Sequence, residues 1–383
     1  MKLVTLNYSE NLGQNQEWIL NKLTLGSKNL IVGRNSTGKT RTLAVLGSLA
    51  RALSSPQFPI RNSCEYSCEW IGSDGTPYIY EYVANYGVIV FERLTIGGEI
   101  KIDRGGGGIG TIFYEQLNGK GGDFLPFQVP QDELAIKKRD ALQHSFLEPL
   151  HQWASEVRHY YFGSPFGKEH MAVFAPNMPA IDEKDPNQVV GLLRNAIRSF
   201  GNEYLSLVIS DMRYLGYNLE SLELGFPVSV DPELVPPGLN CIKVKERGVK
   251  GYVDQVTMSQ GMYRVLALLI NINYLLIKKT STCVIIDDIG EGLDFERSCE
   301  LISLLRKKAE DSNIQIIMST NDKFVMNEVP LSEWTVLSRE GSQVFVSNYA
   351  NSKEKFDDFR FTGLSNFSFF EMDYLQDSES GDD

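Results

Sequence analysis

No apolar stretch in the sequence reaches the length of a membrane span. The longest one, Val265 to Ile277, is 13 residues long and is interrupted by Asn271 and Asn273, whereas a transmembrane helix needs about 20 apolar residues. The first residues, MKLVTLNYSENLGQ, contain no apolar run like that of a signal peptide. We therefore expect no membrane association and no secretion, and predict a cytoplasmic location.

Cysteine and histidine are both scarce. The chain has five cysteines and four histidines, and an odd number of scattered thiols does not predict a disulfide framework. Cys64 and Cys68 have no second pair at the spacing of a zinc site. Both residue types are interpreted as packing or surface residues, so no structural metal site is expected.

The chain also has no excess of positive charge. It carries 37 basic and 49 acidic residues, a net charge of −12, and six of the acids lie in the segment 371–383, which contains no base. The composition therefore shows no basic footprint for nucleic acid, although a local basic groove is compatible with it. DNA stays open as a partner but is unsupported.

Strands and helices alternate at both ends of the chain, as is typical of α/β proteins with a parallel sheet. At 383 residues and 42% hydrophobic content, the chain predicts two or three globular units or one composite domain. Because the pattern occurs at both ends, residues 1–60 and 251–350 are predicted to form one core. The segments that carry it are residues 29–32, 40–53, 260–278, 283–286, 295–309 and 314–318.

The rest of the chain divides by composition into four regions. Residues 61–130, rich in Tyr, Val and Ile with glycine turns, predict an antiparallel β subdomain. Residues 131–250 predict a helical or lid insert, with residues 132–161 and 188–207 expected to be helical. Residues 351–370 are too aromatic for disorder and are expected to dock on the body or on a partner, and residues 371–383 predict an acidic disordered tail.

A glycine-rich loop, GRNSTGKT, follows the first apolar strand and precedes a helix. This context supports a phosphate-binding P-loop over a chance glycine turn. Backbone N–H groups would cradle an anion, Lys39 would meet the β- and γ-phosphates, and Thr40 would bind Mg²⁺. The residues expected to bind ATP are Gly33, Arg34, Asn35, Ser36, Thr37, Gly38, Lys39 and Thr40.

An apolar strand ending in two carboxylates, CVIIDD, lies much later in the chain. Such a strand presents acids at the carboxyl edge of a sheet, where Asp287 would hold Mg²⁺ and Asp288 would orient or deprotonate the attacking water. Alone, a strand ending in two aspartates more often marks a solvated turn.

The segment TMSQGMYR, residues 257–264, opens an apolar helix. Ser259 can cap this helix and Gly261 permits close backbone approach, so the free N–H groups form a second anion site. Two phosphate-binding helix starts in one chain call for an explanation.

These motifs resemble those of the ATP-binding cassette (ABC) ATPases, in which a signature sequence precedes the acidic strand. The resemblance implies an α/β P-loop NTPase fold, an ABC-type ATPase head with a mixed sheet, and ATP and Mg²⁺ as ligands. It implies a homodimer, or a higher oligomer, that sandwiches two ATP molecules, with Ser259, Gln260 and Gly261 acting in trans. Asp294 falls in the position of the D-loop.

The chain departs from the ABC pattern in two places. Asp288 stands where the family usually has glutamate, and Asn321 replaces the switch histidine. We therefore expect ATPase activity with slow turnover, with Asp288, Asn321 and Lys39 as the catalytic residues. Gln128 and Gln131 are the candidates for the lid glutamine.

The long separation of the motifs, without coiled-coil heptads, resembles the RecF and OLD-type ATPases, including the AAA15-like proteins of anti-phage systems. The resemblance implies a switch that controls a separate nuclease- or toxin-like effector protein in antiviral defence. The alternatives are a RecF-like DNA-repair ATPase and, less well supported, the cassette subunit of a transporter.

Overall fold

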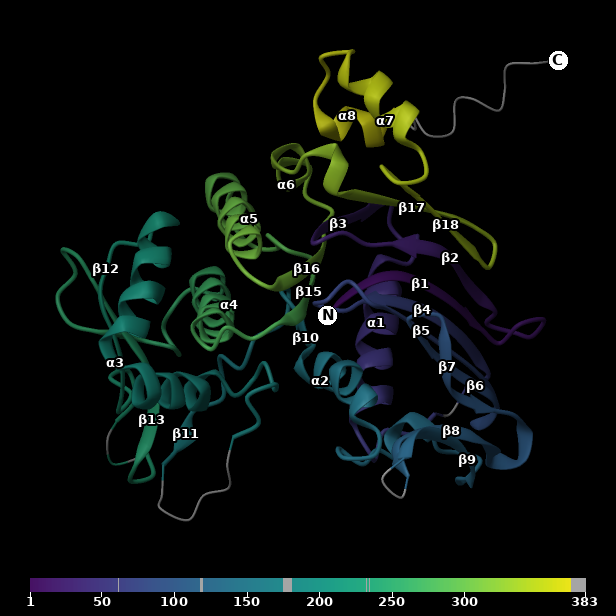
Figure 1. The fold of residues 1–383 in the computed structure, drawn as a ribbon. Helices are drawn as coiled ribbons and strands as arrows, with labels where there is room; N and C mark the ends of the chain where they lie inside the picture. The colour runs from purple at the N-terminus through teal and green to yellow at the C-terminus, as the bar shows by residue number, and fades with distance from the viewer. Residues whose placement is uncertain (61, 118–119, 175–180, 232, 234, 373–383) are drawn as a thin grey trace.

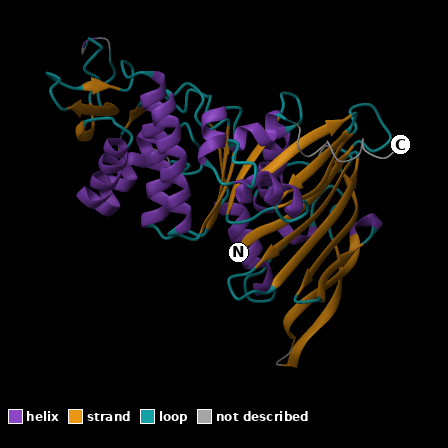
Figure 2. Ribbon diagram, turned by 90° about the horizontal axis from the view of Figure 1, so that it is seen from above, coloured by secondary structure: helices purple, strands orange, loops and turns teal. Residues whose placement is uncertain are grey.

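A computed structural model describes residues 1–60, 62–117, 120–174, 181–231, 233 and 235–372. Helices lie on both faces of one large sheet, and a smaller sheet stands apart beside helices of the insert (Figures 1 and 2). The fold is mixed α/β, as the sequence predicts.

The larger sheet consists of β1 (Lys2–Glu10), β2 (Trp18–Thr24), β3 (Lys28–Gly33), β4 (Cys64–Ile71), β5 (Pro77–Asn85), β6 (Val88–Ile96), β7 (Glu99–Arg104), β8 (Ile109–Leu117), β9 (Lys120–Gln128), β10 (Arg158–Tyr161), β15 (Thr282–Asp287), β16 (Ile314–Ser319), β17 (Trp334–Glu340) and β18 (Gln343–Asn348). The smaller sheet consists of β11 (Ala172–Val173), β12 (Leu219–Gly225), β13 (Leu239–Glu246) and β14 (Val253–Asp254). The helices are α1 (Lys39–Ser54), α2 (Glu148–Glu156), α3 (Val189–Tyr214), α4 (Gln260–Ile277), α5 (Phe295–Glu310), α6 (Lys323–Glu328), α7 (Lys353–Arg360) and α8 (Asn366–Glu371).

The parallel part of the large sheet has the strand order β10-β15-β16-β3-β17. All six residues of β15 and all six of β16 are buried, because helices cover both faces of these strands. Strand β3 comes from the start of the chain and the strands beside it from the end, so the core draws on both ends.

The antiparallel strands β4 to β9 continue the same sheet, which has 14 strands in all. They join it because β1 pairs with β2 on one side and with β4 on the other. Alternate side chains of β4 and β5 point inward, and the rings of Tyr66 and Tyr82 stack at 4.9 Å. The region 61–130 therefore extends the core sheet, as Figure 1 shows.

Two hydrophobic clusters lie on opposite faces of the parallel strands. Leu30 and Val32 of β3 belong to the cluster that includes α4, whereas Ile31 belongs to the cluster that includes α1. Among the described helices α4 is the one long and apolar enough to cross a membrane, with a mean hydropathy of 1.2 over 18 residues, but 72% of that window is buried inside the protein. This burial is typical of a core helix.

The stretch 132–161 is not one helix, so that expectation is wrong. The carboxylate of Asp140 accepts hydrogen bonds from Leu142 N and Gln143 N, which closes a turn, and the helix α2 is only nine residues long. The residues after it pair in parallel with β15 as β10. Tertiary pairing with a buried strand outweighs the local helical pattern. The second expected helix is confirmed as α3, with a break at Gly201, where φ is +59°.

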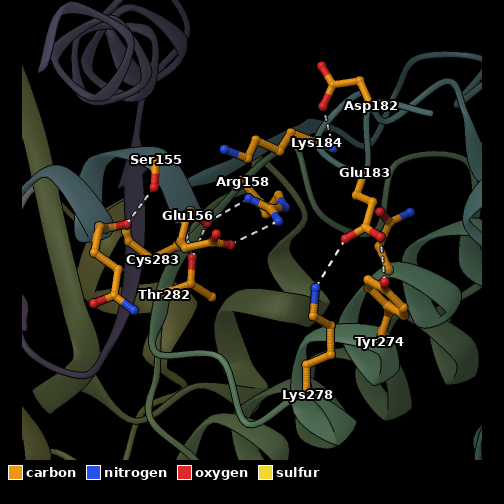
Figure 3. Close-up of polar contacts among 12 residues, drawn as sticks. Ser155, Glu156, Arg158, Asp182, Glu183, Lys184, Tyr274, Lys278, Thr282 and Cys283 are labelled. Carbon is orange, nitrogen blue, oxygen red and sulfur yellow. Dashed lines mark hydrogen bonds and ion pairs between the residues drawn. The ribbon is translucent and has the colours of Figure 1, made fainter. Parts of the chain in front are cut away.

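The insert is fastened to the core at the amino-terminal ends of β10 and β15. Figure 3 shows Glu183, which precedes α3, accepting hydrogen bonds from Tyr274 of α4 and from Lys278, which directly follows this helix. The hydroxyl of Thr282 donates to the backbone oxygen of Glu156, whose carboxylate pairs with Arg158. These contacts tie the loop before α3 to the end of α4, and the segment before β10 to the start of β15.

The aromatic C-terminal segment docks on the body of the protein. Phe356, Phe359 and Phe369 are buried, and Asn366 Nδ2 donates to Val329 O at 2.8 Å, just after α6. Residues 373–383 of the predicted acidic tail lie outside the described residues.

Candidate functional site

The P-loop joins β3 to α1 and closes around the ammonium group of Lys39. This group donates to Gly33 O at 2.7 Å and to Arg34 O at 3.2 Å, and the residue is 7% exposed. Gly38 at the helix N-terminus has a φ of +103°, a conformation that favours glycine. The loop therefore has the curled backbone that an anion-binding turn before a helix requires.

The first part of the loop is open to solvent. Arg34, Asn35 and Ser36 are exposed, as is Thr40 in the first turn of α1, whereas Thr37 is buried. A Cβ on Gly33 would lie 2.5 Å from Thr37 Oγ1 and 2.7 Å from the backbone oxygen of Leu337. Only glycine fits there, because β17 packs directly against the start of the loop.

Two aspartates at the end of β15 lie within electrostatic reach of Lys39. Burial lowers the pKa of the Lys39 ammonium, and the negative charges of Asp288 and Asp287 oppose that shift. Burial likewise raises the pKa of Asp288, helped by the charges of Asp287 and Glu291 and opposed by that of Lys39. About 250 residues of chain separate the lysine from the aspartates, and the sheet brings the three groups together.

Asp288 lies in a left-handed turn. Its φ is +53°, a region where aspartate and asparagine are found more often than other residues with a Cβ. Its backbone N donates to Ser319 Oγ at 3.0 Å. Asp287, in contrast, is 2% exposed and ends the strand itself.

Strand β16 ends beside these aspartates and leads to Asn321. The backbone N of Ile289 donates to Ser319 O at 2.9 Å, and Thr320 Oγ1 donates to Ile289 O at 3.1 Å. Asn321 is exposed at the carboxyl edge of the sheet, just before α6. The edge therefore collects the P-loop, both aspartates and Asn321, as the positions of their strands predict.

The start of α4 packs against the loop that follows the aspartates. Ser259 caps the helix by accepting a hydrogen bond from Met262 N at 3.3 Å and is exposed. A Cβ on Gly261 would lie 3.1 Å from the backbone oxygen of Gly292. Gln260 is the first helical residue, so the three signature residues stand at a helix N-terminus.

Asp294 has a local role in this structure. Its carboxylate caps α5 by accepting a hydrogen bond from Arg297 N at 3.0 Å, and it also pairs with the Arg297 guanidinium. The bond from the Arg297 backbone is the main reason why the pKa of Asp294 is lowered.

The two glutamine candidates are not brought to the P-loop. Gln128 ends β9, the outermost strand at the far end of the sheet, and the backbone oxygen of Gln131 bonds to the backbone of Ile89 in β6. Nearby, Lys137 reaches Phe58 O, just beyond the C-terminal end of α1. The P-loop lies at the opposite end of that 16-residue helix.

Sequence patterns did not point to Tyr161 and Arg264. Tyr161 ends β10 beside Asp287 and is 45% exposed, and Phe162 N donates to Asp287 O at 2.9 Å. Arg264 of α4 donates to the backbone oxygens of Gly163, Ser164 and Glu291. Tyr161 lies in the stretch 132–161, which was predicted to be helical, so its place at the end of a strand was not expected. No local sequence pattern predicts the bonds of Arg264 to backbone oxygens far away in the chain.

A cavity of about 560 Å³ adjoins the first half of the P-loop. Its wall is formed by Arg34–Thr37, by the end of β17 and by Phe369 and Phe370 of α8. The C-terminal segment therefore contacts α6 and lines the cavity that adjoins the P-loop.

These features define an ABC-type ATPase head fold, with a P-loop strand and an acidic strand in one parallel sheet. The structure is similar to that of an SMC head bound to the C-winged helix domain of ScpA, with a TM-score of 0.54 and 11% identity over 92% of this chain and 99% of that chain. It is also similar to an SMC head domain with an extended coiled coil bound to the C-terminal domain of ScpA, derived from Pyrococcus furiosus, with a TM-score of 0.50 and 12% identity over 94% and 99%. At these identities the likeness shows the fold.

No protein-family model and no curated protein sequence matches the chain. The similarity to the two SMC heads confirms, as a fold, the ABC-type head expected from the motifs. The narrower resemblance to RecF and OLD-type ATPases stays a prediction.

Proposed function

We propose that the chain binds Mg²⁺-ATP at the P-loop and hydrolyses it slowly. The observation that carries this proposal is the convergence on Lys39 of residues from both ends of the chain, with Asp287 and Asp288 close enough to shift the pKa of its ammonium. Lys39 would bind the β- and γ-phosphates, and the backbone N–H groups of the loop would cradle them.

The residues at the sheet edge fit a magnesium ion that is shared with a nucleotide. Asp287 and Thr40 offer oxygen atoms, which Mg²⁺ prefers, and Mg²⁺ commonly binds one or two protein ligands together with phosphates. The described residues contain no group of three or more His, Cys, Asp or Glu side chains that could hold a metal by themselves. When bound, the ion would neutralise charge on the phosphates.

Asp288 would orient the attacking water and accept its proton. A raised pKa makes this carboxylate a better base than an ordinary aspartate, as long as it is ionised. Asn321 would donate a hydrogen bond to the γ-phosphate from the next strand, but it supplies no charge. The shorter acid and the neutral switch residue both favour slow turnover.

The signature residues support a dimer. Ser259 and Gly261 begin a helix of one hydrophobic cluster, whereas the P-loop begins a helix of the other cluster, across the sheet. We propose that the exposed N-terminus of α4 closes on the nucleotide of a second copy. Each ATP would then lie between two chains.

On the resemblance to RecF and OLD-type ATPases, we also propose that the ATP state controls a separate effector protein in the cytoplasm, in anti-phage defence. To test this, the Asp288→Asn variant is purified with Mg²⁺-ATP from its native host, and bound proteins and nucleic acid are identified. We expect a stoichiometric nuclease- or toxin-like protein. Recovery of DNA with repair proteins instead would favour the RecF-like alternative.

The nucleotide site is tested with Lys39→Ala. Because the variant loses the charged donor at the centre of the loop, we expect ATP affinity to fall roughly 100-fold, as for the loss of about 3 kcal/mol of charge-assisted hydrogen bonding. Equilibrium binding of a fluorescent ATP analogue measures it. The control is Lys28→Ala at the start of β3, the strand that precedes the P-loop, which removes ion pairs with Glu310 and Glu333. Equal affinities of the two variants would refute the P-loop assignment.

A further inference from the structure

Ser319 is a buried hydroxyl at the end of β16 that bonds to both aspartates at once. The residue is 0% exposed. Its Oγ donates to Asp287 Oδ1 and accepts the hydrogen bond from Asp288 N. A serine hydroxyl has one proton and two lone pairs, so the proton is committed to Asp287 and one lone pair to the Asp288 backbone.

The first bond fixes the carboxylate of Asp287. With Oδ1 occupied by the serine, the group cannot rotate without breaking a buried hydrogen bond to a charged acceptor, which is stronger than a bond between neutral groups. The carboxylate is thereby held in one orientation, with Oδ2 left over for a cation.

The second bond fixes the backbone of Asp288. A residue with a Cβ at a φ of +53° needs support from its surroundings, because in this conformation the Cβ lies close to the following carbonyl oxygen. The bond from its N–H to Ser319 Oγ supplies this support, and the neighbouring bond from Ile289 N to Ser319 O extends it. The turn that carries the proposed base is thus fastened to the strand that leads to Asn321.

We propose that Ser319 is the positioning residue of the magnesium site: its hydroxyl orients Asp287 toward Mg²⁺ and sets the turn of Asp288. The inference rests on the proposed ATP-binding function and deepens it. Partners that orient metal ligands typically change metal affinity or activity by 10–100-fold when they are removed. The expected consequence is a specific loss of Mg²⁺ affinity, separate from the binding of the nucleotide itself.

The test compares Ser319→Ala with the wild-type protein in complex with a fluorescent, non-hydrolysable ATP analogue. Mg²⁺ is titrated into each complex, and nucleotide affinity is measured separately in EDTA. We expect the Mg²⁺ concentration at half-saturation to rise roughly 10–100-fold, with nucleotide affinity in EDTA unchanged. Ser319→Thr keeps the hydroxyl and should stay near the wild-type value.

The matched control is Thr282→Val, which removes another buried hydroxyl at the opposite end of β15, where Thr282 donates to Glu156 O (Figure 3). It should lose stability without changing the Mg²⁺ titration. If Ser319→Ala does not fold, Ser319→Cys, with its weaker donor, should still raise the Mg²⁺ requirement. An unchanged Mg²⁺ titration in the Ser319 variants, or an equal loss in EDTA, overturns the inference. Failure of the wild-type protein to bind the analogue in EDTA and in Mg²⁺ would instead overturn the proposed function.

Discussion

Asp288 combines a left-handed backbone with a carboxyl group whose pKa is raised. Its φ of +53° is tolerated better by aspartate than by longer or branched residues, which gives a structural reason for the shorter acid at this position. Burial and the charges of Asp287 and Glu291 raise the pKa of the carboxyl. Both properties cost stability in the folded state and are typical of residues kept for function.

The raised pKa predicts a pH-dependent gain of stability in Asp288→Asn. A carboxyl whose pKa is higher in the folded state opposes folding only where it is ionised. The variant should therefore be more stable than wild type at pH 7, and the difference should vanish as pH falls through the folded pKa to below the unfolded value near 3.9. Urea unfolding at several pH values measures the difference.

Asp294→Asn is the control with the opposite sign. Hydrogen bonds from Arg297 lower the pKa of Asp294, so the ionised carboxylate supports folding above its unfolded pKa. That variant should be less stable at pH 7, and its deficit should shrink as pH falls through the unfolded pKa toward the lower folded one. The same sign in both variants would contradict the electrostatic account of the turn.

At the residue scale, the sequence predicts the groups whose chemistry follows from a local motif. Lys39, Asp287 and Ser259 stand at strand ends and helix starts in the structure, as their flanking patterns require. The partners of Ser319 and Arg264 could not be predicted, because their bonds join residues up to 101 positions apart through the packing of the sheet. Gln128 and Gln131 were chosen because they follow the antiparallel region, but β9 carries Gln128 to the far edge of the sheet and the backbone of Gln131 bonds to Ile89 of β6.

Helix α8 contacts α6, the helix after Asn321, and lines the cavity beside the P-loop. Phe369 packs against Phe356 and Phe359, with ring centroids 4.7 and 5.0 Å away, and lines the cavity beside residues 34–37. The backbone N of Phe367 donates to Asn327 Oδ1 of α6 at 2.8 Å. The segment therefore stabilises the edge of the site from outside the sheet.

We predict that Phe369→Ala destabilises the fold by roughly 3–5 kcal/mol, as is usual when a buried phenylalanine is truncated. Phe361→Ala is the control, since this side chain, in the same segment, is 89% exposed and should change stability by no more than about 0.5 kcal/mol. Chemical unfolding measures both. Similar values for the two variants would mean that the segment is not docked as the structure shows.

At the element scale, periodic apolar patterns predict α1, α4, α5, β15 and β16 to within a few residues. The stretch 132–161 was mispredicted because its apolar residues serve three different environments: short turns, the nine-residue α2 and the sheet strand β10. Local periodicity does not contain the pairing with β15 that makes β10 a strand.

At the scale of the whole molecule, the sheet separates the two helix starts that are proposed to bind anions. Helices α1 and α4 pack into different hydrophobic clusters on opposite faces of the parallel strands (Figure 1). The N-termini of these two helices lie on different faces of one sheet. This arrangement suits a symmetric pair of chains, in which the same two surfaces come into contact at two equivalent places. The resemblance to ABC ATPases implies such a pair of chains, and the two helices lie on opposite faces of the sheet, as the proposed ATP sandwich requires.

The most direct test of this account mixes two variants that should each be inactive alone. Lys39→Ala removes the P-loop lysine and Ser259→Arg blocks the signature, so neither homodimer has an intact composite site. A mixed dimer has one, formed by the P-loop of the Ser259→Arg chain and the signature of the Lys39→Ala chain. We predict that mixing restores ATP-dependent association and ATPase activity in proportion to the fraction of mixed dimers, and a mixture as inactive as its separate components would contradict the proposed ATP sandwich.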